Sequence, residues 1–181
     1  MDLSNIFRRP PGNGARPPDL RLRPDEDDGA GLPSRSGAET ERKKVPRAAC
    51  ILLVEDNPAD VLLVQESLDE HGIDCDLAVI NDGEKAFQFI DRIEAGEESC
   101  PALLVLDLNL PRKSGREVLS RLRASSVCAE VPVVILSSSD APRDKKEAAQ
   151  LGATLYIRKP SNLDDFMAVG AILKRILSGA S

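Results

Sequence analysis

Between residues 48 and 177, short apolar runs alternate regularly with longer segments in which apolar residues recur at helical spacing. The five apolar runs are AACILLVE, IDCDLAVI, ALLVLD, VPVVILS and ATLYIR. Their length and apolar character are typical of strands buried in a parallel sheet. Five strands that alternate with helices predict an α/β fold, in which helices cover both faces of one parallel sheet.

The segments between the runs carry helix start and stop signals. In the first of them, Asn57 can cap a helix, Pro58 takes the first helical position and Gly72 closes the helix. The other helices are expected over about residues 82–93, 115–125, 141–151 and 162–177. The commonest arrangement for five such units is the flavodoxin-like (βα)5 doubly wound sheet with strand order 2-1-3-4-5. Ligands of such sheets bind outside the carboxyl ends of the strands, here between strands one and three.

Residues 1–47 differ from this pattern. They contain seven of the 13 prolines, no apolar periodicity, and eight acidic and ten basic residues. Such a segment buries too little apolar surface to offset the entropy lost on ordering. We therefore expect a disordered extension over residues 1–47 and one folded domain over residues 48–178, with no output domain after it.

Composition excludes several classes of protein. The net charge of −6 argues against a nucleic-acid footprint, and no apolar run approaches the ~20 residues of a membrane helix. The N-terminus lacks an apolar signal core, so a cytoplasmic location is expected. The single histidine rules out a His-rich metal site. The four cysteines form no CxxC pair, and we expect all of them to be reduced thiols.

Polar side chains stand where the expected strands end. Glu55 and Asp56 end strand one, Asp107 ends strand three, Ser137 ends strand four and Lys159 follows strand five. The fold brings these positions to one edge of the sheet. Clustered carboxylates repel one another, and a divalent cation removes that conflict. Because all the ligands are oxygen atoms, the sequence predicts Mg2+.

The same cluster can bind a phosphoryl group. Glu55, Asp56 and Asp107 can supply carboxylates to the ion, and the backbone carbonyl of Asn109 can turn back toward it. Mg2+ and the ammonium of Lys159 would neutralise the transferring phosphoryl group. Asp107 would be the nucleophile and would become an acyl phosphate. An apolar strand that ends in an exposed carboxylate suits this role.

The stretches LLVEDNPAD, LVLDLNLPRKSG, PVVILSSSD and LYIRKPSNLDDF resemble the receiver domain of two-component response regulators. The resemblance covers about residues 49–177. The first three stretches also resemble the small single-domain regulators that partner bacterial phytochromes. Two positions depart from the common pattern: serine stands at 137 where threonine is commoner, and Glu55 stands where aspartate is commoner.

The resemblance implies a role for each matched position. Asp107 is the phosphoacceptor, and Glu55, Asp56 and the Asn109 carbonyl hold Mg2+, with Glu55 reaching the ion through water. Lys159 pairs with the phosphate. The remaining two residues implied by the resemblance are the switch hydroxyl Ser137 and the switch aromatic Tyr156.

The resemblance also implies partners. The phosphoryl donor is a sensor histidine kinase, a bacterial phytochrome within the narrower group. The output is protein contact, through a homodimer or a phosphorelay partner on the face of helix four, strand five and helix five, with no nucleic acid or membrane involved. Arg112, Lys113 and Arg116 either steer the kinase or the phosphate, or are simply solvated.

Two other functions remain open from the residues alone. The first is a phosphatase that uses an aspartate nucleophile, but such an enzyme needs a general acid two positions later, and that position is Asn109. The second is a binding scaffold that never takes phosphate, which the intact Asp107, Lys159 and acidic pair argue against. We expect no enzymatic turnover beyond self-phosphorylation from the kinase.

Overall fold

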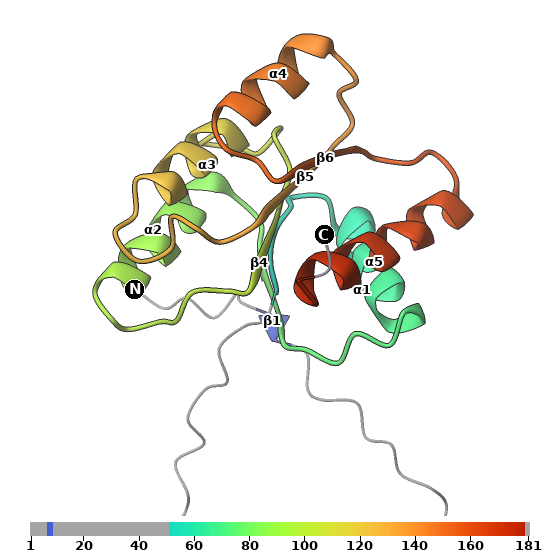
Figure 1. The fold of residues 1–181 in the computed structure, drawn as a ribbon, viewed down its shortest axis with the longest axis horizontal. Helices are drawn as coiled ribbons and strands as arrows, with labels where there is room; N and C mark the ends of the chain where they lie inside the picture. Colours follow the sequence, from blue (N-terminus) through green and yellow to red (C-terminus); the bar gives the residue numbers. More distant parts are fainter. Residues whose placement is uncertain (1–6, 9–50, 180–181) are drawn as a thin grey trace, which may run out of the picture. The chain divides into compact units, whose positions relative to one another are not determined.

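The computed structural model describes residues 7–8 and 51–179, and strands alternate with helices from residue 51 onward (Figure 1). The strands are β1 (Phe7–Arg8), β2 (Ile51–Val54), β3 (Leu77–Ile80), β4 (Leu103–Leu106), β5 (Val133–Ser137) and β6 (Leu155–Arg158). The helices are α1 (Pro58–Glu70), α2 (Gly83–Glu94), α3 (Gly115–Arg123), α4 (Pro142–Gln150) and α5 (Leu163–Leu177). The predicted alternation of elements is therefore confirmed.

The strands form a single sheet in the order β1-β3-β2-β4-β5-β6. The five strands from β2 to β6 run parallel, which confirms the flavodoxin-like (βα)5 order 2-1-3-4-5. In the register of the sheet, Val54 of β2 lies between Ile80 of β3 and Leu106 of β4. The residues that follow these strands therefore leave the sheet at the same level.

Alternate residues of each strand face opposite sides of the sheet and build two cores. On β4, Leu104 and Leu106 pack in the core beneath α2 and α3, whereas Leu103 and Val105 pack in the core beneath α1 and α5. Figure 1 shows the resulting three layers, with α2, α3 and α4 on one side of the sheet and α1 and α5 on the other. Burial on both faces explains why the strands read as continuous apolar runs.

Side-chain caps fix the starts of α1 and α2, the helices that follow β2 and β3. Asn57 accepts a hydrogen bond from the Ala59 amide at 3.0 Å, as predicted, and Pro58 opens α1. Asp82, expected inside the second helix, is instead the cap of α2 and accepts from the Lys85 amide at 2.8 Å. These caps satisfy amide groups that a helix end otherwise leaves unpaired.

Strand β1 was not predicted. Phe7–Arg8 pairs antiparallel with β3 and adds a sixth strand outside the parallel five. The rest of the expected disordered extension over residues 1–47 lies outside the described residues. Within the part of the chain that the structure describes, none of the helices has the length and apolar character needed to cross a membrane.

The prediction of four reduced cysteines is wrong for Cys100 and Cys128, which form a disulfide with 5.8 Å between their Cα atoms. Cys100 precedes β4 and Cys128 precedes β5, and these are neighbouring parallel strands. Their amino ends therefore lie side by side. Sequence spacing hides this pairing, because 28 residues separate the two cysteines.

Candidate functional site

The site lies at the carboxyl edge of the sheet, where backbone hydrogen bonds hold the residues that follow the strands. The Glu55 amide donates to Ile80 O at 2.9 Å, and the Asp107 amide donates to Val54 O at 3.0 Å. The Lys159 amide donates to Ser137 O at 2.8 Å in the same way. The ladder thus extends by one residue beyond each strand and holds the functional side chains on rigid backbone.

Three carboxylates converge at this edge. One oxygen each from Glu55, Asp56 and Asp107 lies within 4.8 Å of the others. Glu55 is buried and Asp56 is exposed. The expectation of an exposed Asp107 is wrong: its side chain is buried, because Lys159 packs against its carboxylate. Hard divalent cations prefer oxygen ligands, and this all-oxygen set fits Mg2+ or Mn2+ in chemistry and in spacing. The structure therefore brings together the three side chains that the sequence assigned to metal binding.

Lys159 is the cation at the centre of the carboxylates. Its Nζ atom lies 2.8 Å from each of Glu55 Oε2, Asp107 Oδ2 and Asp60 Oδ2. Burial alone would lower the pKa of Lys159, but hydrogen bonds to Asp107 and Asp60 and the negative charge of Glu55 outweigh it and raise that pKa above its ordinary value. Burial raises the pKa of Glu55, and Lys159 opposes this effect. Lys159 is therefore a fixed positive charge.

Sequence reasoning missed Asp60. It lies in the first turn of α1, where acidic residues are common because they interact favourably with the helix dipole. The available signal was position: α1 starts directly after the acidic pair that follows β2, so its first turn lies beside the site. The position alone did not distinguish a residue of the site from an ordinary helix-end carboxylate.

The loop after β4 holds the Asp107 carboxylate. Asp107 Oδ1 accepts a hydrogen bond from the Asn109 amide at 3.0 Å. Leu108 and Leu110 are buried and anchor the loop on either side of the exposed Asn109. A Cβ atom at Gly115 would lie 2.0 Å from Asp107 O, so glycine is needed where α3 begins. The role predicted for the Asn109 carbonyl remains a prediction.

Ser137 and Tyr156 both contact Ser139, two residues after Ser137. The buried Ser137 Oγ accepts from the Ser139 amide at 3.3 Å, and Tyr156 Oη donates to Ser139 O at 2.9 Å. Ser139 Oγ in turn donates to Asp144 at 2.5 Å. Hydrogen bonding to Ser139, and then the charge of Arg116, lower the pKa of Asp144. Ser139 thus links the two predicted switch residues to α4.

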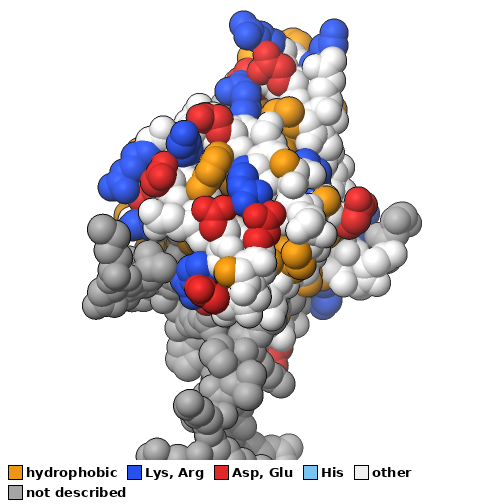
Figure 2. Space-filling view, turned by 90° about the vertical axis from the view of Figure 1, so that its left-hand side faces the viewer, with side chains coloured by type: hydrophobic (Ala, Val, Ile, Leu, Met, Phe, Trp, Pro, Cys, Tyr) orange, Lys and Arg blue, Asp and Glu red, His pale blue; other side chains and the backbone are white. Residues whose placement is uncertain are grey.

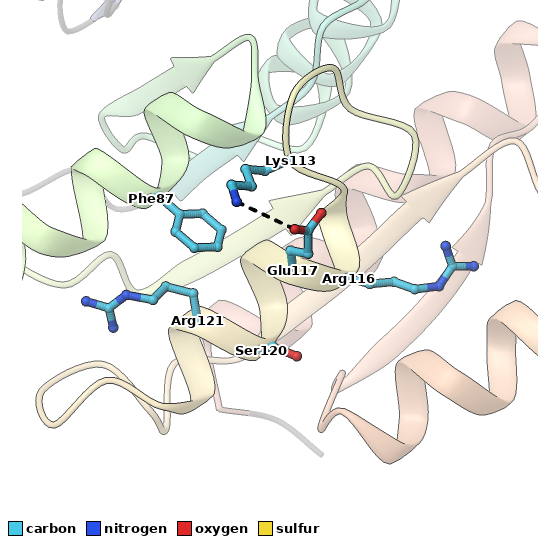
Figure 3. Close-up of a pocket in the computed structure, with 6 residues that line it drawn as sticks. All are labelled: Phe87, Lys113, Arg116, Glu117, Ser120 and Arg121. Carbon is cyan, nitrogen blue, oxygen red and sulfur yellow. Dashed lines mark ion pairs between the residues drawn. The ribbon is translucent and has the colours of Figure 1, made fainter.

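The basic residues after Asp107 are paired with acids of the chain. Arg112 lies 3.4 Å from Asp82 and Lys113 lies 3.8 Å from Glu117, and Arg116 bridges to α4. Lys113 and Arg116 line an open pocket of about 450 Å³, together with Phe87, Glu117, Ser120 and Arg121 (Figure 3). Figure 2 shows the same side of the molecule, where acidic and basic side chains alternate. This pattern favours local ion pairing of these cations.

Comparisons with known proteins agree with this geometry. Residues 51–170 match the model of the family described as "Response regulator receiver domain". Response regulator Rcp1 of Synechocystis sp. is 41% identical over 116 residues, which are 64% of this chain and 79% of Rcp1. Residues 51–170, the range matched by the family model, include every residue of the site described above, from Glu55 to Lys159.

Two crystal structures are similar in fold and sequence. The phosphorylated cyanobacterial phytochrome response regulator RcpA has a TM-score of 0.67 and 35% identity, over 74% of this chain and 97% of RcpA. The Mn2+-bound form of Rcp1 has a TM-score of 0.64 and 37% identity, over 70% of this chain and 92% of Rcp1. One relative is thus known with a phosphoryl group and another with a divalent metal.

Proposed function

Because the chain belongs to the response regulator receiver domain family, we propose that it accepts a phosphoryl group on Asp107 from a sensor histidine kinase. The observation that carries this proposal is the position of Asp107. Its buried carboxylate follows β4, beside Glu55 and Asp56, and lies 2.8 Å from the ammonium of Lys159. Such a site combines a nucleophile with positive charge for the incoming phosphate.

The proposed reaction is a single phosphoryl transfer. A carboxylate oxygen of Asp107 forms a bond to phosphorus as the bond from phosphorus to the histidine nitrogen of the kinase breaks. The electron pair of that bond leaves with the nitrogen. The Asn109 amide and Lys159 hold the two carboxylate oxygens of Asp107 and so orient it before the reaction.

Glu55, Asp56 and Asp107 are the residues that would hold Mg2+, with the carbonyl of Asn109 as a fourth ligand. When bound, the ion neutralises charge on the transferring phosphoryl group. The oxygen-only cluster of the described residues and the Mn2+-bound form of Rcp1 support this assignment. Without an ion, repulsion among the three carboxylates remains, and Lys159 offsets part of it.

Ser137 and Tyr156 are the proposed switch. Since Ser137 Oγ accepts from the Ser139 amide, its own hydroxyl hydrogen is available to a phosphoryl oxygen. A phosphoryl group adds about −1.5 to −2 charge and three acceptor oxygens, enough to draw Ser137 toward it. Ser139 would then move, and the hydrogen bond from Tyr156 Oη to Ser139 O would change with it.

The proposed output is protein contact on the face formed by α4, β6 and α5. β6 is the last strand of the sheet, and Leu155 on it is exposed. A homodimer or a phosphorelay partner would bind there, and we propose no nucleic-acid target. The similarity to RcpA favours a phytochrome as the sensor kinase, and such a partner would place the chain in the cytoplasm.

Incubation with Mg2+ and acetyl phosphate tests the proposal. The wild type should gain the mass of one phosphoryl group, in an alkali-labile form, and Asp107→Asn should gain none. Asp164→Asn, which removes an exposed carboxylate on α5, is the matched control and should react like the wild type. Rapid multiple turnover would indicate a phosphatase instead, and an unmodified wild type would indicate a binding scaffold.

A further inference from the structure

Asp60 is the carboxylate in the site that neither the acceptor role nor the metal cluster uses. It lies in the first turn of α1, and its Oδ2 atom lies 2.8 Å from Lys159 Nζ. The acidic cluster that could hold a cation consists of Glu55, Asp56 and Asp107 and does not include Asp60. The contact that joins Asp60 to the site is its hydrogen bond from Lys159. The side chains of Asp60 and Lys159 are only 19% and 12% exposed, which limits the screening of their attraction by water.

Three carboxylates surround the ammonium of Lys159, and two of them accept hydrogen bonds from it. Nζ donates to Asp60 Oδ2 and to Asp107 Oδ2 at 2.8 Å, and it lies 2.8 Å from Glu55 Oε2 without a hydrogen bond to that atom. A phosphoryl group on Asp107 would therefore compete with these carboxylates for the ammonium. Which carboxylate leaves depends on how firmly each one is held.

Asp60 is the carboxylate that is released most easily. Glu55 is 1% exposed, and its Oε1 atom also accepts from the Asn57 amide at 3.1 Å, so it cannot turn to solvent. Asp107 loses its carboxylate charge when it takes the phosphoryl group, so it no longer competes for the ammonium as an anion. Asp60 is the most exposed of the three, and the amino end of α1 stabilises its charge when the lysine leaves.

We propose that Asp60 is a positioning residue that holds Lys159 in its unphosphorylated position and gives it up to the phosphoryl group. The inference rests on the proposed function, since it concerns phosphoryl transfer to Asp107. Breaking the contact between Asp60 and Lys159 also separates the start of α1 from the connection between β6 and α5. Phosphorylation would thus loosen one tie between two helices that share a core.

The test compares phosphorylation rates with acetyl phosphate and Mg2+. The phosphorus forms a bond to an Asp107 oxygen while its bond to acetate breaks, and acetate leaves with the electron pair. In Asp60→Asn, an amide oxygen replaces a carboxylate and holds Lys159 more weakly. The rate should rise about two- to tenfold, the range expected for weakening one hydrogen bond that competes with the reaction.

Two further variants separate positioning from general charge. Glu66→Gln removes one negative charge from an exposed position on α1 and should leave the rate unchanged. In a Lys159→Met background, which is itself slow, adding Asp60→Asn should have no further effect. Thermal unfolding of Asp60→Asn by circular dichroism should show a folded protein, so that any change in rate is not caused by unfolding.

The proposal is overturned if Asp60→Asn reacts at the wild-type rate or more slowly. It is also overturned if Glu66→Gln speeds the reaction as much, or if the effect persists without Lys159. These results leave the acceptor role of Asp107 intact, as long as the wild type is phosphorylated and Asp107→Asn is not. A wild type that takes up no phosphate overturns both proposals.

Discussion

The two edges of the sheet are built in opposite ways. At the carboxyl edge, Glu55, Asp107 and Lys159 bring buried charges together, and the acidic charges outnumber the basic one. At the amino edge, the Cys100–Cys128 disulfide crosslinks the segments before β4 and β5, and Arg123 binds neighbouring carbonyl groups. One edge concentrates repulsion and the other concentrates stabilising contacts.

Arg123 shows how the amino edge is closed. From the last turn of α3, its guanidinium donates to Ala129 O at 2.7 Å and to Val131 O at 2.8 Å. It also donates to Gly152 O at 2.8 Å through Nη2. These carbonyls lie in the segments that lead into β5 and β6, where no strand neighbour is available to them. Burial lowers the pKa of Arg123, and the negative charge of Glu130 opposes this effect.

The difference teaches where stability and reactivity are located. A reactive carboxylate must be kept near other charges, and this disfavours folding when no cation is bound. The opposite edge carries no such requirement and can be optimised for stability. Substitutions at the amino edge should therefore lower stability and spare phosphorylation, whereas substitutions at the carboxyl edge should do the reverse.

The disulfide should give the largest effect on stability. Reducing a crosslink between residues 28 apart should lower the free energy of unfolding by about 3–4 kcal/mol, because the unfolded chain regains entropy. Urea unfolding followed by circular dichroism, with and without reductant, measures this difference. The same reductant should not change the free energy of unfolding of Cys100→Ser, because this variant lacks the disulfide. If oxidised and reduced wild type have the same free energy of unfolding, the disulfide does not stabilise the amino edge.

Arg123→Ala should give the next largest effect. It leaves the carbonyls of Ala129, Val131 and Gly152 without their donor, and we expect a loss of about 2–3 kcal/mol in urea unfolding. The phosphorylation rate at low temperature should stay at the wild-type value. Arg143→Ala is the matched control: this side chain is 84% exposed, and its loss should leave the free energy of unfolding close to the wild-type value. A slower phosphorylation in Arg123→Ala would contradict the separation of roles.

Asp56→Asn should change stability in the opposite direction. Removing this exposed member of the acidic cluster relieves repulsion and should raise the free energy of unfolding in EDTA by about 0.5–1 kcal/mol. Its affinity for Mg2+, measured by isothermal titration calorimetry, should fall about tenfold or more. Asp164→Asn should change neither quantity. A destabilised Asp56→Asn would mean that the cluster is not under repulsion.

Glu94→Gln tests an ion pair between two helices, α2 and α3, and it should have the smallest effect. Arg121 of α3 hydrogen-bonds to Glu94 at the end of α2 and lowers the pKa of Glu94 from 4.5 to about 2. Because the folded pKa is depressed, the stabilisation is present above pH 4.5 and is lost as the pH falls toward 2. The difference in melting temperature between wild type and Glu94→Gln should therefore shrink over that range. If the difference in melting temperature stays constant over this pH range, protonation of Glu94 does not change the stability of the fold.

Much of the fold and the site could be predicted because the relevant signals are local. The apolar run before Asn57 marks a strand, and Asn57 and Pro58 mark the start of a helix. The connections of a parallel sheet then restrict the strand order. The carboxyl ends of the strands then bring Glu55, Asp107 and Lys159 together without further information. Asp60, Ser139 and the Cys100–Cys128 pair escaped prediction because each depends on which distant side chain lies opposite it.

The sequence by itself determined the alternating elements, the edge at which the site forms and the residue types available there. Hydrophobic periodicity and helix caps are properties of neighbouring residues, so they can be read along the chain. Only the tertiary structure decided that Lys159 is shared by three carboxylates and that Arg123 and a disulfide close the opposite edge. Hydrogen bonds and ion pairs act over about 3 Å, and positions at that range are set by packing, not by sequence spacing.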